Sequence, residues 1–211
     1  MKLYTYFRSS AAYRVRIALN LKGLDYEAVP IHLTKDGGRH RSPEFRAINP
    51  HMRVPALALD NGAVLTQSLA IIDYLDETHP EPALLPTDPV RRAEVRAFAQ
   101  VIACDIHPLN NLVSLQYLRR TLNHDQLAID NWYHHWIHAG FQSLEATIQA
   151  GPYAFGREVT LADVCLVPQM YNARRLKVPL EKYPKLVAAE TALLRLSAFD
   201  AARPENQPDA E

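Results

Sequence analysis

The spacing of hydrophobic positions changes along the chain, and the change predicts two domains. Up to residue 80, short runs of alternating apolar residues are separated by amphipathic stretches, whereas after residue 90 only the i, i+3, i+4 spacing of helices is found. Between them, residues 79–89 contain four prolines, which interrupt helices and strands alike. We therefore expect a first domain over residues 1–80, a linker over 81–89 and an all-helical second domain over 90–211.

The first domain has the pattern of a small mixed sheet with helices on its faces. Residues rich in β-formers predict strands at 2–7, 26–33, 54–59 and 63–65, and apolar stripes predict helices at 14–23, 44–49 and 67–76. Asn61-Gly62, between the last two strands, is a strong hairpin signal. The resulting order, βαβαββα, is that of an α/β fold. The polar residues 34–42 are expected to form an exposed loop.

The second domain is expected to be helical throughout. Apolar spacing predicts helices over 91–123, 126–149, 161–173 and 183–196. Thr160 and Asp163 have the spacing of a capping box at the start of the third of these helices. Cys104 lies in an apolar run and is expected in the core. Residues 201–211 are polar and contain two prolines, so a frayed tail is expected.

Composition and charge narrow the functional classes. The 23 basic and 23 acidic residues give a formal net charge of zero, which argues against binding to the phosphate backbone of nucleic acid. No apolar run approaches the roughly 18 residues of a membrane span, and the N-terminus lacks the apolar core of a secretion signal. The two cysteines lack CxxC or zinc-ligand spacing, and His134 and His138 have no evident third ligand. We therefore expect a soluble, cytoplasmic protein without a bound metal.

Three short segments of the first domain could bind an anionic or peptide-like ligand. Ser9 and Ser10 lie between a strand and a helix, where a hydroxyl can donate to an anion or can simply cap the helix. If the Val54–Pro55 bond is cis, the Val54 backbone can turn outward and pair with an extended peptide. Gln67–Ser68 precede another helix, whose first N–H groups suit a carboxylate, with capping as the alternative.

The segment Tyr6–Leu19 resembles the signature of zeta-class glutathione transferases. Residues 35–38, 54–55, 67–72 and 160–169 match the same family in order and spacing, so the likeness extends over residues 2–200. The resemblance implies a thioredoxin-like N-terminal domain that binds glutathione and an all-helical C-terminal domain that binds the substrate. It also implies that the chain forms a homodimer.

The resemblance further implies which residues contact glutathione. Ser9 faces the sulfur, with Ser10 and Ala11 beside it. The other implied contacts are His40 near the glycyl end, the Val54 backbone and a cis Pro55 at the cysteinyl part, Gln67 and Ser68 at the γ-glutamyl carboxylate, and His107, Asn111 and Leu112 from the helical domain. Ala11 stands where many members have a cysteine, and Tyr13 replaces a usual tryptophan. This departure puts reactions that need that cysteine, such as some conjugations and dehalogenations, in doubt.

The family includes isomerases of maleyl acids, and the resemblance therefore implies a glutathione-dependent cis–trans isomerase. The implied reaction converts maleylpyruvate to fumarylpyruvate, a step of aromatic breakdown, by reversible addition of a thiolate to the double bond. Because the substrate would be a small dicarboxylate, cations near the sulfur are expected: Arg8 is a candidate because it is adjacent to Ser9, and Arg175 because it matches a family arginine. Maleylacetoacetate isomerisation in tyrosine breakdown, general glutathione transfer, and a non-catalytic role as an interaction or stress protein stay open as alternatives.

Overall fold

The computed structural model describes all 211 residues and divides them into two compact units. The first unit consists of residues 1–83 together with 195–211, and the second of residues 84–194. The prediction that the helical domain extends to residue 211 is wrong, because residues 195–211 pack with the first unit. The contact is polar as well as apolar, since Asn20 Nδ2 donates to the Ala198 carbonyl oxygen over 2.9 Å.

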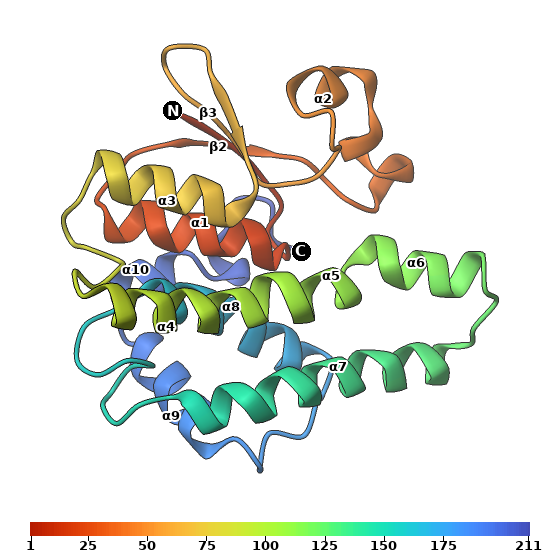
Figure 1. Cartoon of the computed structure of the whole chain (residues 1–211). Helices are drawn as coiled ribbons and strands as arrows, with labels where there is room; N and C mark the ends of the chain where they lie inside the picture. Colours follow the sequence, from red (N-terminus) through yellow and green to blue (C-terminus); the bar gives the residue numbers. More distant parts are fainter. The chain divides into compact units, whose positions relative to one another are not determined.

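The first unit contains a four-stranded mixed sheet (Figure 1). Its strands are β1 (Lys2–Thr5), β2 (Glu27–Pro30), β3 (Ala56–Ala58) and β4 (Val64–Thr66), in the spatial order β2-β1-β3-β4. β2 runs parallel to β1, while β3 is antiparallel to both β1 and β4. The predicted order of elements and the predicted hairpin are confirmed, although β1, β2 and β3 are shorter than the apolar pattern suggested and β4 begins one residue later than predicted.

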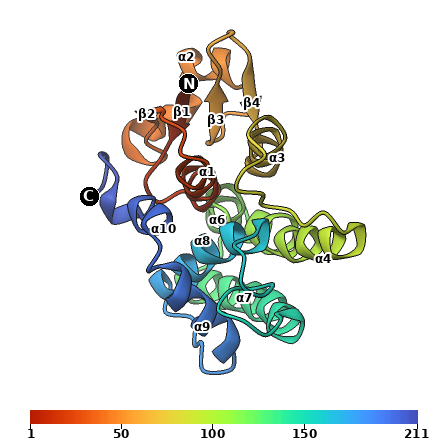
Figure 2. The same ribbon diagram turned by 90° about the vertical axis from the view of Figure 1, so that its left-hand side faces the viewer.

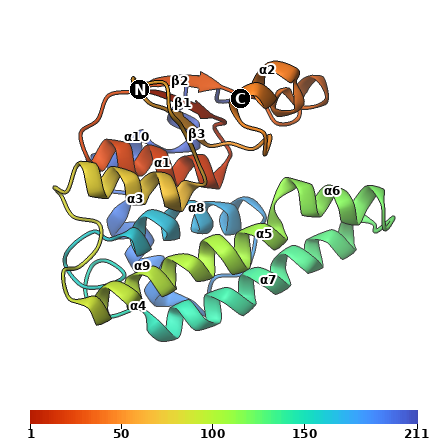
Figure 3. The same cartoon turned by 45° about the horizontal axis from the view of Figure 1, so that its top comes forward.

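Four helices belong to the first unit, and the last of them lies in the C-terminal segment. They are α1 (Ser10–Leu21), α2 (Pro43–Ile48), α3 (Ser68–Thr78) and α10 (Ser197–Ala201), with short 3-10 turns η1 (Lys35–Gly37), η2 (Arg39–Arg41) and η4 (Pro204–Asn206). Figure 3 shows α1 and α3 running side by side against the strands. Leu3, Ile17 and Leu57 are completely buried between them. Each such side chain contributes roughly 1.5–3 kcal/mol to stability.

The segment after β2 is more ordered than an exposed loop. It forms η1 and η2, and the His40 side chain is buried. Gly38 permits this burial, because its φ is +96° and a Cβ there would meet His40 Cε1 at 2.5 Å. The polar composition of residues 34–42 predicts only a loop and gives no sign of these two 3-10 turns.

The predicted frayed tail is wrong. Residues 197–201 form α10 and residues 204–206 form η4, and Ala202, Pro204 and Gln207 are buried. The reason lies in α1, where the wholly buried Arg16 donates from Nε to the Ala202 carbonyl oxygen over 3.0 Å. The hydrogen bonds that order this polar tail come from a residue outside it, so the sequence of the tail alone does not predict them.

The second unit is all-helical, as predicted. Its helices are α4 (Pro89–Gln100), α5 (His107–Asn110), α6 (Leu112–Arg120), α7 (Gln126–Thr147), α8 (Leu161–Arg175) and α9 (Pro184–Leu193), with the π-helical segment η3 (Val101–Ile106) after α4. Figure 2 shows α8 among the other helices of the unit. Most of α8 is buried, and it packs against α4 and α9. None of the helices combines the length and apolar character that crossing a membrane requires.

The single long helix predicted over residues 91–123 is broken. η3 follows α4 without interruption, and Asn111 adopts an extended conformation between α5 and α6. Pro108 explains part of the break, since it lacks the N–H that a continuous α-helix would use. Cys104 lies in this π-helical segment and is exposed, so its predicted place in the core is wrong.

The predicted capping box at the start of α8 is confirmed. The Asp163 carboxylate accepts hydrogen bonds from Thr160 N (2.8 Å), Thr160 Oγ1 (3.0 Å) and Ala154 N (2.8 Å). Asp163 is completely buried, and this burial raises its pKa to about 6 against the lowering effect of the donors.

Candidate functional site

Four segments of the first unit leave the sheet at the same edge. Tyr4 pairs with Ala56, Ala56 with Thr66, and Thr5 with Pro30. The carboxyl ends of β1, β2 and β4 and the start of β3 therefore lie together. The segments that carry Ser9, His40, Val54–Pro55 and Gln67–Ser68 begin or end at this edge, which is where α/β sheets bind ligands.

Ser9 is the N-cap of α1, and its hydroxyl oxygen accepts a hydrogen bond from Ala12 N over 3.2 Å. Its own N–H donates to the Tyr6 carbonyl oxygen over 2.9 Å, which closes the turn between β1 and α1. A hydroxyl has one hydrogen and two acceptor sites, so capping the helix leaves the hydrogen to donate to an anion. Ser9 can therefore cap α1 and donate a hydrogen bond to an anion at the same time. Ser10, the first residue of α1, is buried.

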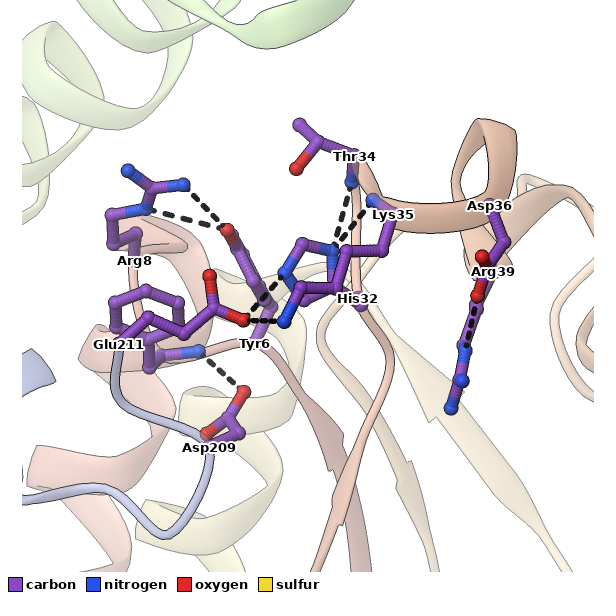
Figure 4. A network of polar contacts seen from close by, with 10 residues as sticks. Tyr6, Arg8, His32, Thr34, Lys35, Asp36, Arg39, Asp209 and Glu211 are labelled. Atoms are coloured by element: carbon purple, nitrogen blue, oxygen red, sulfur yellow. Dashed lines mark hydrogen bonds and ion pairs between the residues drawn. The ribbon is translucent and has the colours of Figure 1, made fainter.

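Arg8 provides an exposed positive charge next to Ser9. Its Nη2 and Nε donate to the Tyr6 hydroxyl over 2.8 and 3.3 Å (Figure 4). Its guanidinium carbon also lies 5.0 Å from the centre of the Phe7 ring. Both contacts restrict the side chain, so the cation is held beside the turn that carries Ser9.

The start of α3 can accept a carboxylate. Gln67 occupies the N-cap with φ at +68°, and its side chain makes no capping hydrogen bond. The first backbone N–H groups of α3 therefore lack a side-chain cap. The buried Ser68 hydroxyl accepts from Arg14 Nη1 over 3.2 Å, which leaves its hydrogen to donate, as at Ser9. An uncapped helix N-terminus with a hydroxyl donor fits a ligand carboxylate.

Val54 and His40 are the remaining predicted ligand residues of the first unit. The Val54–Pro55 bond is cis, as predicted, and Val54 precedes Ala56, the first residue of β3 that pairs with a neighbour. The polar backbone groups of Val54 thus lie outside the ladder and can pair with an extended ligand. Burial, together with the charge of Arg41, lowers the pKa of His40, so this imidazole is neutral at pH 7.

The predicted ligand residues of the second unit gather where the long helix breaks. His107 is the first residue of α5, Asn111 is the N-cap of α6 and Leu112 begins α6. Asn111 Oδ1 accepts from Val113 N (2.9 Å) and Ser114 N (3.1 Å), which orients its amide. The amide NH₂ group stays a donor.

The adjacent arginines at the end of α8 have different surroundings. Arg174 forms a bidentate ion pair with the buried Glu190, with Nε–Oε1 at 3.0 Å and Nη2–Oε2 at 2.6 Å. Arg175 is exposed and hydrogen-bonds to Tyr133. Burial raises the pKa of Tyr133 to about 12, and the charge of Arg175 opposes this rise. Arg174 is therefore committed to the fold, whereas Arg175 offers a charge at the surface.

A family model matches most of the first unit of the chain, and known proteins and solved structures match nearly its whole length. Residues 3–83 match the family model "Glutathione S-transferase, N-terminal domain". The maleylacetoacetate isomerase of Pseudomonas aeruginosa is 49% identical over 99% of this chain and 98% of its own length, and the maleylpyruvate isomerase of a Ralstonia species is 49% identical over 100% of both. The solved holo structure of a maleylpyruvate isomerase, described as a bacterial glutathione-S-transferase of the zeta class, covers 100% of both chains at 47% identity and a TM-score of 0.96. The chain belongs to the zeta-class glutathione transferases.

Two buried arginines of this zeta-class chain were missed from the sequence. Arg14 supports the Ser68 hydroxyl, and Arg16 donates from Nη2 to the Phe7 carbonyl oxygen over 3.0 Å. Both interrupt the apolar run of α1 and are almost fully buried. Charges inside an apolar helix are rare unless they are paired, and this rarity is the signal that could have found them.

Both paired histidines of α7 lie within hydrogen-bond distance of groups outside that helix. His134 Nε2 is 3.0 Å from the Leu176 carbonyl oxygen, and His138 Nδ1 is 2.7 Å from the Tyr183 hydroxyl. No group of three or more His, Cys, Asp or Glu residues is arranged to hold a metal ion. The two histidines connect α7 to the end of α8 and the start of α9.

Proposed function

We propose that this chain binds glutathione and isomerises maleylpyruvate to fumarylpyruvate. The observation that carries the proposal is the position of Ser9, a hydroxyl donor at the N-terminus of α1, in a chain about half identical to maleyl-acid isomerases along their length. The first unit would bind glutathione, and the helical unit would contribute the substrate side of the site.

The residues of the first unit suit each part of glutathione. The uncapped start of α3, with Gln67 and Ser68, would hold the γ-glutamyl carboxylate. The Val54 backbone would pair with the cysteinyl part, and His40 would lie toward the glycyl end. Ser10 and Ala11 would line the first turn of α1 beside the sulfur, and His107, Asn111 and Leu112 would approach from the helical unit.

When bound, glutathione supplies a thiolate that adds reversibly to a carbon–carbon double bond and so permits rotation about it. Ser9 would hold this sulfur in its charged form. A free thiol has a pKa of about 8.5, and lowering it by about 2 units takes roughly 2.7 kcal/mol. A hydrogen bond to a charged group supplies about 1.5–3 kcal/mol and a helix N-terminus about 0.3–1 kcal/mol. Ser9 and α1 together are sufficient.

Arg8 and Arg175 would act on the charges of the substrate. A maleyl acid is a dicarboxylate, and negative charge grows on its conjugated carbonyl during the reaction. Arg8, fixed on Tyr6 beside Ser9, would stabilise that charge. Arg175, with its planar guanidinium, would bind a terminal carboxylate through two parallel hydrogen bonds.

Maleylacetoacetate is the second candidate substrate, because the relatives named for it are as similar to this chain as those named for maleylpyruvate. The two acids share the maleyl unit and differ in the tail. General glutathione transfer and a non-catalytic role are weaker alternatives, since neither needs Arg8, Ser9 and Arg175 together.

Rates on the two maleyl acids, with and without glutathione, test the proposal. We expect the absorbance of the maleyl group to disappear only when glutathione is present, and faster for maleylpyruvate. Faster turnover of maleylacetoacetate would make that acid, and not maleylpyruvate, the preferred substrate. Binding of glutathione with neither acid converted would overturn isomerisation, as would conversion without glutathione.

A homodimer is part of the same proposal. Four of the six large hydrophobic side chains that are exposed lie on or next to the α6–α7 hairpin: Val113, Tyr117, Leu122 and Leu127. Three of them line an apolar groove of about 860 Å³ together with Trp132 and Trp136. A concentration of apolar surface of this kind favours an interface, and a second copy of the chain is the occupant that the family resemblance implies.

A further inference from the structure

The turn that carries Arg8 and Ser9 is held by one residue of the following helix and by one residue of the C-terminal segment. Arg16 Nη2 donates to the Phe7 carbonyl oxygen over 3.0 Å, and Asp209 Oδ2 accepts from the Phe7 N–H over 3.1 Å. Both polar groups of Phe7 are thereby engaged. Asp209 stands 202 positions away along the chain, so the contact exists only because the C-terminal segment folds back onto the first unit.

The same segment is attached at a second point (Figure 4). Glu211 Oε1 lies 3.3 Å from His32 Nε2 and also forms an ion pair with Lys35. His32 Nδ1 accepts from Lys35 N over 2.8 Å, which places the ring hydrogen on Nε2, toward Glu211. The C-terminal segment thus connects the turn after β1 with the segment after β2.

The Asp209 contact is more enclosed than an ordinary surface hydrogen bond. Its second oxygen, Oδ1, is shielded from solvent and has no hydrogen-bond partner. Burying half of a carboxylate without a partner costs free energy, so this arrangement is poor as a purely stabilising device. The carboxylate does, however, fix the backbone N–H of Phe7, two residues before Ser9.

We propose that Asp209 is a positioning residue that sets the direction of the Ser9 hydroxyl through the Phe7 peptide. This inference rests on the proposed function, because it assigns the residue a role in the same site. Asp209 acts through the backbone. Arg16 holds the Phe7 carbonyl oxygen, Asp209 holds its N–H, and Ser9 N closes the turn on the Tyr6 carbonyl oxygen at 2.9 Å. Misplacement of a reacting group by about 1 Å can reduce a rate about 100-fold.

Charge and geometry predict opposite effects at this position, which makes the role testable. A carboxylate near the sulfur disfavours the thiolate, so a purely electrostatic role predicts that Asp209→Ala and Asp209→Asn both lower the thiol pKa of bound glutathione. A positioning role predicts that Asp209→Ala raises it, because Ser9 loses its direction. Asp209→Asn keeps an oxygen that can accept from Phe7 N and should behave like the natural chain or have a slightly lower pKa.

The experiment titrates bound glutathione by the ultraviolet absorbance of its thiolate in the full-length protein and in both variants. Glu205→Ala serves as the matched control, since Glu205 is exposed in the same segment and pairs only with Arg203. We expect Asp209→Ala to raise the thiol pKa and lower kcat at neutral pH about tenfold, with recovery at higher pH and KM for the maleyl acid changed less than about twofold. Asp209→Asn should restore both values.

Two outcomes would overturn the assignment. One is equal thiol pKa values in Asp209→Ala and the control, and the other is a decrease shared by Asp209→Ala and Asp209→Asn. Should Asp209→Ala fail to fold, a kcat and thiol pKa in Asp209→Asn that differ from the natural chain by more than tenfold or one unit would count against positioning. If the natural chain does not lower the pKa of bound glutathione at all, the proposed function itself fails, and the two failures are thereby distinguished.

Discussion

The Ser9 oxygen accepts a hydrogen bond from Ala12 N, and its hydrogen is the donor assigned to the sulfur. The capping role and the catalytic role belong to one hydroxyl group, yet substitutions can separate them. Glycine at an N-cap costs only a few tenths of a kcal/mol relative to serine, whereas alanine costs about 1 kcal/mol. Neither residue has a hydroxyl.

We therefore expect Ser9→Gly and Ser9→Ala to lower kcat by a similar factor, roughly 10- to 100-fold, because both remove the hydrogen bond to the thiolate. Only Ser9→Ala should lower the free energy of unfolding by about 1 kcal/mol. Steady-state kinetics and urea unfolding measure the two effects. Unchanged kcat in both variants would transfer the role to Ser10, which a Ser10→Ala variant would then reveal.

The neighbouring arginines of α8 form a natural matched pair. For Arg175→Ala we expect a KM for the maleyl acid that is about tenfold higher or more, with glutathione affinity unaltered, because a carboxylate clamp is lost. Arg174→Ala should leave KM nearly unchanged and lower the free energy of unfolding by about 1–3 kcal/mol, because Glu190 stays buried without its partner while Arg174 itself is half exposed. Equal losses of substrate and glutathione binding in Arg175→Ala would refute the clamp.

The capping box of α8 connects one helix terminus to the pH dependence of stability. Asp163 has a pKa of about 6 in the folded chain, above its ordinary value of about 3.9 in an unfolded chain. The folded state therefore binds the proton more tightly, and the stability from this group is full below about pH 4 and lost as the pH rises through 6.

From this shift we expect the free energy of unfolding to fall by about 2 kcal/mol between pH 4.5 and pH 7.5 on account of Asp163 alone. Asp163→Asn cannot titrate, so the difference between the natural chain and this variant should isolate the effect. Urea unfolding of both proteins across that range is the measurement. A difference that does not change with pH would show that the donors from Thr160 and Ala154 outweigh burial.

The way the helices are divided also determines where the predicted ligand residues of the second unit lie. The π turn of η3 and the break at Asn111 divide a helix that the apolar pattern predicts as continuous, and they bring His107, Asn111 and Leu112 to the ends of short helices. A local period cannot reveal this break, because the residues on both sides of it keep helical spacing. In the folded chain α5 packs against both η3 and α7.

For the molecule as a whole, the apolar groove on the α6–α7 hairpin is the feature that a second copy would cover. We expect a dimer by size-exclusion chromatography with light scattering, and a monomer for Tyr117→Arg, because a charge in an apolar interface is costly. Val90→Arg is the control, since Val90 is also an exposed hydrophobic residue but lies on α4. A dimer that persists in Tyr117→Arg would place the interface elsewhere.

Local patterns were sufficient for much of this protein. The βαβαββα order, the hairpin at Asn61-Gly62, the capping box and the serine before α1 follow from hydrophobic period and turn chemistry, which act within a few residues. These features fix which groups can reach the sheet edge, and the resemblance carried by the same segments pointed to glutathione.

Other features exist only in the folded chain. Arg16 and Asp209 hold the Phe7 peptide from opposite ends of the sequence, and the C-terminal segment is ordered by a buried guanidinium on α1. Hydrogen bonds between residues so far apart depend on the packing of the whole unit. No period or propensity encodes them, because their partners become neighbours only after the chain has folded.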